Sequence, residues 1–331
     1  MAGSSHRNLE RGAFFALPGS VLAALCAAPV LLAPLAPLPA QAAEIKSDKV
    51  SFYFAAHEDD WQLFMDPTAF EDVLGGAAKT VFVYTTAGDD GLGMGTGGRK
   101  FPYYLARENG AINAMRFMAD ADRTPIAEAG GDVTFNGHAV FRTSYRNTIG
   151  YFLRLPDGDA LGTGFAGTGY QSLKKLADGD IATLAAIDGS TVYHGWSDLV
   201  ATVHAIIDHE RGRAPLVQIN VADPDPRINP ADHSDHLMTG KAALDAAADM
   251  SCVRRVFYVD YASSKLPENL NARERDMESA VFAVTLAGVI AFDQGTAWQH
   301  YDQSFVGRNY FRVQEPAGHC TAAPAVIAAK H

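Results

Sequence analysis

Short apolar runs alternate with longer amphipathic segments along most of the chain. Near-continuous apolar runs bounded by turn residues predict buried strands, and segments with apolar positions three and four residues apart predict helices. From these patterns we expect strands over 50–54, 80–85, 216–221 and 255–261, and helices over 68–74, 105–118, 197–209, 237–248 and 272–287. Strands that alternate with helices favour one α/β layer structure with a mostly parallel sheet and helices on both faces.

One segment departs from this alternation. Between about 132 and 150, apolar positions on both sides of Asn136-Gly137 change to the two-residue period of strands. Asn-Gly is a strong signal for a two-residue hairpin turn. We therefore expect a small β-hairpin insertion at about 132–150. Asp157 and Gly158 follow it as ordinary turn formers, and we expect no functional role for them.

The first 42 residues differ in composition from the rest. Arg7 and Arg11 precede a Leu/Ala/Pro-rich run, and Ala40-Gln41-Ala42 is a small-x-small cleavage signal. Four prolines break the run, which favours a secretory signal peptide over a membrane anchor. We expect a signal peptide over 1–42, a single domain over 43–331, no membrane span after cleavage, and a secreted or periplasmic protein.

Composition and charge narrow the possible partners. The chain has 331 residues, 48% of them hydrophobic, which is enough for a large core. Its formal net charge of −11 disfavours nucleic acids and anionic membranes as partners. Cys252 and Cys320 lie in the part of the chain that we expect to be exported. The sequence is compatible with either one disulfide between them or two buried thiols.

Two polar clusters adjoin predicted strands and helices. His57-Glu58-Asp59-Asp60 follows the first strand, and His233-Ser234-Asp235-His236 stands directly before the helix over 237–248. His57, Asp60 and His236 form a two-imidazole, one-carboxylate set, which is typical of a catalytic zinc with one open position. Fe(II), Co and Mn also accept such a set.

The remaining polar residues of the clusters have roles that fit this chemistry. Asp59 is the candidate general base, and His233 is the candidate to stabilise an oxyanion. Asp235 would orient one of the histidines. Each cluster by itself would more often be a surface loop or a helix cap. The presence of both clusters, each beside a buried strand, favours an active site.

The two clusters resemble motifs of a known family. Ala56-His57-Glu58-Asp59-Asp60 is similar to the Ala-His-Pro-Asp-Asp motif of the PIG-L/LmbE-like zinc-dependent N-acetylglucosaminyl deacetylases, and 233–236 resembles their His-Pro-Asp-His motif. The segments 85–91 and 155–158 continue the likeness. The resemblance implies a Rossmann-like α/β fold, zinc ligands His57, Asp60 and His236, Asp59 as base, and His233 at the oxyanion.

The implied activity is removal of an N-acyl group, expected to be acetyl, from an amino sugar or glycoconjugate. Glu58 and Trp61 depart from the motif, which usually has Pro and Glu there. Arg107 and Trp61 are the candidate substrate-binding residues, although Gly110 replaces the Glu of the family's Arg-x-x-Glu pattern. The alternatives are an amidase that acts on a non-sugar, glycolipid or glycopeptide conjugate, and a non-catalytic relative that binds metal and carbohydrate.

Overall fold

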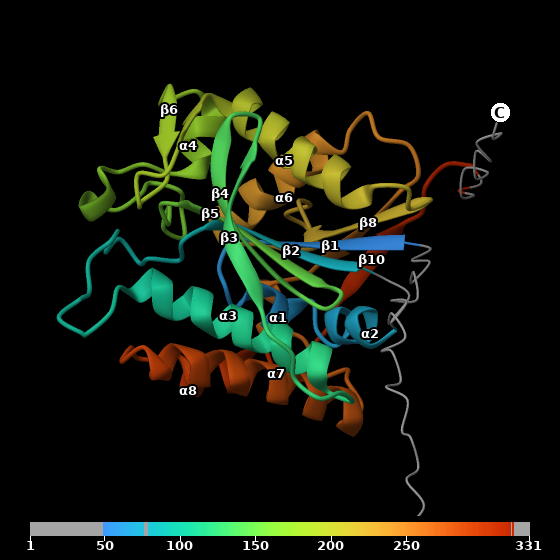
Figure 1. The fold of residues 1–331 in the computed structure, drawn as a ribbon. Helices are drawn as coiled ribbons and strands as arrows, with labels where there is room; N and C mark the ends of the chain where they lie inside the picture. Colours follow the sequence, from blue (N-terminus) through green and yellow to red (C-terminus); the bar gives the residue numbers. More distant parts are fainter. Residues whose placement is uncertain (1–48, 76–78, 319, 321–331) are drawn as a thin grey trace, which may run out of the picture. The chain divides into compact units, whose positions relative to one another are not determined.

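A computed structural model describes residues 49–75, 79–318 and 320 (Figure 1). The predicted signal peptide over 1–42 lies outside these residues. An eight-stranded sheet runs through the described part in the order β10-β9-β8-β1-β2-β5-β4-β3, and a separate two-stranded sheet pairs β6 with β7. The prediction of a mostly parallel sheet with helices on both faces is confirmed.

The strands and helices follow the predicted periods closely, with ends that differ by a few residues. The strands are β1 (Lys49–Ala55), β2 (Lys79–Thr86), β3 (Ala129–Phe135), β4 (His138–Tyr145), β5 (Thr148–Leu155), β6 (Thr183–Ala185), β7 (Val192–His194), β8 (Leu216–Ala222), β9 (Val253–Tyr258) and β10 (Phe311–Gln314). The α-helices are α1 (Asp60–Phe64), α2 (Thr68–Leu74), α3 (Tyr103–Asp120), α4 (Leu173–Asp178), α5 (Trp196–Arg211), α6 (Ser234–Ala246), α7 (Ala272–Ala291) and α8 (Trp298–Ser304). Two 3₁₀ turns are η1 (Ala166–Thr168) and η2 (Tyr261–Lys265).

Five central strands are parallel: β9, β8, β1, β2 and β5 pair in that spatial order. Numbered along the chain and read from β5, this is the order 3-2-1-4-5, which matches five strands of the six-stranded Rossmann order. The chain leaves β1 for β2 on one side and later returns to pair β8 on the other side. The gap between β1 and β8 is therefore the topological switch point, where open α/β sheets bind ligands beyond the carboxyl ends of their strands.

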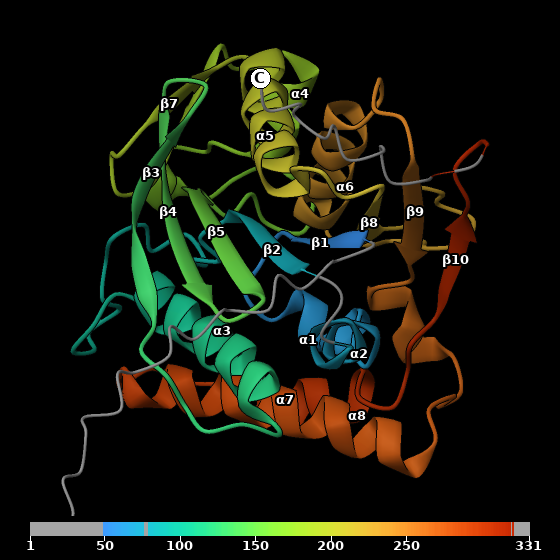
Figure 2. The ribbon, with the colours of Figure 1, turned by 45° about the vertical axis from the view of Figure 1, so that its right-hand side comes forward.

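The main sheet has a separate hydrophobic core on each of its two faces. Successive side chains of a strand point to opposite faces, so each central strand contributes to both cores. In β1, Phe52 and Phe54 face a core shared with α5 and α6, and Tyr53 faces a second core shared with α1, α2, α3 and α7. Figures 1 and 2 show these helix groups on opposite sides of the sheet. Burial on both faces explains why the strands read as unbroken apolar runs.

The predicted hairpin is present and belongs to the main sheet. Asn136 and Gly137 join β3 to β4, and Phe135 pairs with His138 next to the turn. β4 then pairs with β5, so the hairpin extends the sheet edge as an antiparallel continuation. β10 forms an antiparallel edge on the other side, against β9. The pattern analysis did not find β10, because its four residues are too few to show a period.

Helices α3 and α7 approach closely where each carries a glycine. A Cβ atom on Gly110 would lie 2.5 Å from the Thr285 carbonyl oxygen, and one on Gly288 would lie 2.6 Å from the Gly110 Cα. The Asn109 side chain donates a hydrogen bond to the Gly288 carbonyl at 2.8 Å. The glutamate that the family pattern has at position 110 would not fit against α7.

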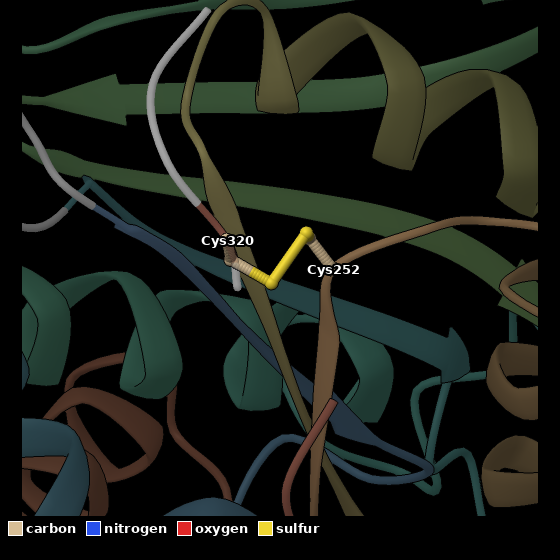
Figure 3. The surroundings of a disulfide bond; sticks show 2 residues. All are labelled: Cys252 and Cys320. Atoms are coloured by element: carbon tan, nitrogen blue, oxygen red, sulfur yellow. A yellow bond between two sulfur atoms is a disulfide. The ribbon is translucent and has the colours of Figure 1, made fainter. Parts of the chain in front are cut away.

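A disulfide joins Cys252, before β9, to Cys320, with their Cα atoms 5.5 Å apart (Figure 3). Of the two states left open by the sequence, the structure has the disulfide. No helix in the described residues is long and apolar enough to span a bilayer.

Replacing Gly110 with alanine tests the close helix contact. We expect G110A to lower the free energy of unfolding by about 1–3 kcal/mol, because overpacking outweighs the gain in helix propensity. Denaturant unfolding followed by circular dichroism measures this. Gly295, where an added Cβ meets no heavy atom within 4 Å, is the matched control. Equal stability of G110A and G295A would contradict the packing described here.

Candidate active site

Three side chains converge at the switch point from β1 and from the chain that follows β8. His57 stands two residues after β1, and Asp60 begins α1. The backbone N–H of His57 donates to Asp60 Oδ2 at 2.7 Å, which closes the turn between them. His236 lies in the first turn of α6, which follows β8. All three side chains are buried.

The donor atoms of these residues form a nearly equilateral triangle. His57 Nδ1 lies 3.3 Å from Asp60 Oδ1 and 3.2 Å from His236 Nε2, and His236 Nε2 lies 3.2 Å from Asp60 Oδ1. A tetrahedral zinc with bonds of about 2.0–2.1 Å requires donors about 3.3–3.4 Å apart. The two histidines and the aspartate therefore fit a zinc ion with one position left for solvent or substrate.

In His57 and His236, the ring nitrogen that is not part of the triangle has carboxylates near it. His57 Nε2 lies 3.7 Å from both Asp157 and Asp235, and His236 Nδ1 lies 2.9 Å from Asp232 Oδ1 and 3.4 Å from Asp260 Oδ2. Metal-binding histidines usually turn the second ring nitrogen to such a partner, which fixes the tautomer and the ring orientation. Asp232 hydrogen-bonds His236 Nδ1 in this way, whereas Asp157 and Asp235 lie beyond hydrogen-bond distance of His57 Nε2, so the predicted orienting role of Asp235 stays a prediction.

The cluster carries an excess of buried negative charge. Five buried aspartates surround the two histidines, and in the described residues His57 and His236 are their ion-pair partners. Burial opposes the charged form of His57, but Asp60, Asp235 and Asp157 raise its pKa to about 10. Burial likewise opposes the charged form of His236, and Asp60 and Asp232 raise its pKa. In the described structure, protonated histidines would have to balance the negative charge of these carboxylates. A bound divalent cation would balance that charge instead.

His233 caps the N-terminus of α6. Its Nδ1 accepts a hydrogen bond from the backbone N–H of Asp235 at 3.1 Å, so the proton of the neutral ring is assigned to Nε2. Burial, together with His57 and His236, lowers the pKa of His233 to about 3. The ring lies edge-on to His57, with centroids 4.8 Å apart. His233 is therefore a neutral donor beside the triangle.

Other buried His/Asp groups in the described residues could also hold a metal: His57, His233 and His236; His57, Asp157, His233 and Asp235; and Asp232, His236 and Asp260. Ligand atoms in each group lie within 4.8 Å of one another. The triangle with Asp60 has all three donor distances at 3.2–3.3 Å, as tetrahedral zinc requires, and it leaves the capping bond of His233 intact. His57, Asp60 and His236 are therefore the candidate metal ligands.

The turn at Asp157 and Gly158, for which we expected no role, lies against the candidate site. Asp157 is buried and forms an ion pair with His57 at 3.7 Å. The Gly158 backbone N–H donates to Asp235 Oδ2 at 2.7 Å, and a Cβ on Gly158 would lie 2.6 Å from Asp235 Oδ1. The turn after β5 thus brings a carboxylate and a backbone donor to the site.

Asp59 and Arg107 form a pair on the wall of a cavity beside the triangle. The Arg107 Nη2 group donates to Asp59 Oδ1, and both residues line the cavity. The predicted base and one predicted substrate-binding residue therefore lie at the same cavity as His57, Asp60 and His233. Arg107 is also bound to protein acceptors, which the sequence did not indicate.

The prediction that Trp61 contacts the substrate is wrong. Its side chain is 0% exposed and packs in the core beneath the sheet. The indole N–H donates to the Tyr84 hydroxyl at 2.7 Å, and the indole ring lies 4.6 Å from that of Phe82. Trp61 falls on the inner side of α1, which the pattern analysis did not find.

The cavity has a volume of about 330 Å³. Aromatic residues contribute to its lining from several elements: Phe64, Tyr103, Phe165, Tyr261 and Tyr301. Its acidic members are Asp59, Asp60, Asp90, Asp157 and Asp159. In the described chain, the hairpin of β3 and β4 contributes no residue to this lining.

The sequence analysis did not find several residues of the candidate site. Asp232 and Asp260 orient His236, and Tyr261 and Tyr301 line the cavity. Asp232 stands directly before the second cluster, at an i to i+4 spacing from His236, and that spacing was a usable signal. Asp260 and the tyrosines lie in segments with no recognisable motif.

The chain is similar in structure to a known protein but matches none by sequence. No family model matches the sequence, and a search of curated proteins finds no match. Among solved structures, N,N'-diacetylchitobiose deacetylase from Pyrococcus horikoshii, in complex with its inhibitor MPG, is similar at 12% identity and a TM-score of 0.46. The match covers 81% of this chain and 84% of that chain.

The contact between Asp232 and His236 leads to a test of the metal site. We expect Asp232→Asn to weaken zinc binding about 10- to 100-fold, because the ligand loses the partner that orients it. Competition with a chromogenic chelator measures the affinity. Asp245→Asn, which changes a side chain bound to Lys241 at 2.6 Å on the surface, is the control. Unchanged affinity in Asp232→Asn would remove His236 from the ligand set.

Proposed function

We propose that this chain is a metal-dependent hydrolase that removes an N-acyl group, with acetyl expected, from an amino sugar or glycoconjugate. One observation carries the proposal. His57, Asp60 and His236 present three donor atoms 3.2–3.3 Å apart at the edge of a cavity that Asp59 and His233 also line. This combines a metal-ligand set with a candidate base and a candidate oxyanion donor.

His57, Asp60 and His236 would hold zinc. When bound, zinc lowers the pKa of its water and polarises a carbonyl oxygen. Asp59 then acts as general base and takes a proton from the attacking water. The water oxygen bonds to the amide carbon, and His233 Nε2–H donates to the oxygen that becomes negative. The proton passes to the leaving nitrogen, the C–N bond breaks, and a carboxylate and an amine result.

The cavity lining supports a carbohydrate rather than an anionic substrate. Flat aromatic faces pack against the apolar C–H face of a sugar ring, and carboxylates accept hydrogen bonds from its hydroxyl groups. The five lining aspartates outnumber the single arginine, Arg107, and so disfavour phosphorylated or carboxylated ligands. A volume of about 330 Å³ lies in the usual range for small-ligand sites.

We also propose that the protein is exported to the periplasm or the exterior. The signal-peptide pattern over 1–42 supports this. The disulfide between Cys252 and Cys320 supports it independently, because such bonds persist in oxidising compartments.

Amine release from a panel of N-acetylated and longer N-acylated amino sugars, sugar conjugates and peptides tests the proposed activity. We expect release from the sugars, loss of release after treatment with a chelator, and recovery when zinc is added back. Release that survives metal removal, verified by elemental analysis, would contradict a metal-dependent mechanism. Release from peptides alone would favour an amidase for non-sugar substrates.

The role of Asp59 has its own test. Asp59→Asn should retain bound zinc and lower kcat by about 10²–10⁴-fold, because general-base catalysis contributes about this much. Asp120→Asn is a matched control, since Asp120 pairs with Arg146 and its side chain has the same 17% exposure as that of Asp59. Asp120→Asn should keep kcat within about twofold. A fully active Asp59→Asn would remove the base assignment.

A further inference from the structure

Glu58 lies between a candidate metal ligand and the candidate base, and it is buried. Its exposed fraction is 1%, although it occupies a turn after β1 between two residues that line the cavity, His57 and Asp59. The motif that this segment resembles has proline here, so the carboxylate is a property of this chain. Burying a carboxylate has a large desolvation cost unless a cation and hydrogen bonds compensate it.

A cation beside it is Arg107, which also contacts Asp59; the Arg107 charge offsets only part of the burial cost, and burial raises the pKa of Glu58 to about 8. Arg107 Nε lies 3.0 Å from Glu58 Oε2, and Nη2 donates to Asp59 Oδ1. Its third nitrogen, Nη1, lies 3.4 Å from the Gly88 carbonyl oxygen. A guanidinium group is planar and rigid, so fixing Nε on one carboxylate fixes the direction in which Nη2 points.

The backbone leaves space for this arrangement. A Cβ on Gly88 would lie 2.6 Å from Glu58 Oε2 and 2.8 Å from Arg107 Nε. Gly88 also has a φ of +50°, a conformation that glycine adopts without strain. The Gly-rich loop after β2 therefore packs directly on the Glu58–Arg107 pair and limits the movement of the guanidinium group.

We propose that Glu58 is a positioning residue, which sets the orientation of the base Asp59 through Arg107. The inference rests on the proposed function, because it assigns a task to the neighbour of the proposed base. Arg107 is held by Glu58, Asp59 and Gly88 on the cavity wall. Without the Glu58 carboxylate, Arg107 Nε loses its contact, and the guanidinium group that meets Asp59 is no longer fixed in direction.

Glu58→Gln tests the proposal, because it keeps the size of the side chain and replaces the carboxylate beside Arg107 with a neutral amide. We expect kcat to fall about 10- to 100-fold, as for a reacting group misplaced by a fraction of an ångström to 1 Å. KM should stay within about threefold, and zinc content should be unchanged. Arg107→Lys, which cannot span both carboxylates, should lower kcat similarly, and the double variant should lose little more than either single variant.

Glu108→Gln is the matched control. Glu108 is also buried and pairs with an arginine, Arg154, at 2.6 and 2.8 Å, but neither residue lines the cavity. This variant should be less stable than the wild-type enzyme, but its kcat should stay within about twofold of the wild-type value. Equal kcat values for Glu58→Gln and Glu108→Gln would overturn the proposal, as would additive losses in the double variant.

A crystal structure of zinc-loaded Glu58→Gln gives a readout that does not depend on activity. We expect the Asp59 carboxylate to leave its wild-type position while His57, Asp60 and His236 keep theirs. An unmoved Asp59 would overturn the positioning role even if kcat falls. Absence of amine release by the wild-type enzyme would contradict the proposed function alone, and this structure would still decide the positioning.

Discussion

The parallel pairing of β1 with β8 is the constraint on which the candidate site depends. Lys49 to Tyr53 pair with Leu216 to Asn220 in a continuous register, so the two strands end at the same edge of the sheet. A buried hydrogen bond of 2.9 Å from the Asn220 side chain to the Phe52 carbonyl adds to this pairing. His57 leaves one strand and the segment leading to His236 leaves the other. Without this pairing the two polar clusters would not meet.

The convergence concentrates negative charge in a buried space. Asp60, Asp157, Asp232, Asp235 and Asp260 surround two imidazoles, and an arrangement of this kind is costly unless a cation balances it. The metal that we propose would therefore stabilise the fold around the site as well as supply chemistry. The disulfide at the start of β9 acts at a different place and does not contribute to the charge balance.

Glycines determine how closely the other segments approach. Gly110 lets α3 contact α7, Gly88 makes room for the Glu58–Arg107 pair, and Gly158 lets the turn after β5 reach Asp235. At each position an added Cβ would lie 2.6 Å or less from a neighbouring atom. Helix α3 thus packs against α7 and against the Gly-rich loop that follows β2. This placement brings Arg107 to Asp59.

The sequence by itself determined the α/β class, four of the five central parallel strands, and the residues of the candidate triangle, while β5 was expected only as part of the hairpin insertion. Hydrophobic period is a local property, and the two His/Asp clusters are contiguous motifs whose chemistry follows from residue type. Only the tertiary structure decided that Trp61 faces the core, that Asp157 and Asp232 contact the histidines, and that Glu58 holds Arg107. Except for Asp232, which is four residues from His236, these outcomes depend on contacts between distant segments or on the face of a short helix. Strand pairing and side-chain packing determine such contacts, and no local pattern encodes them.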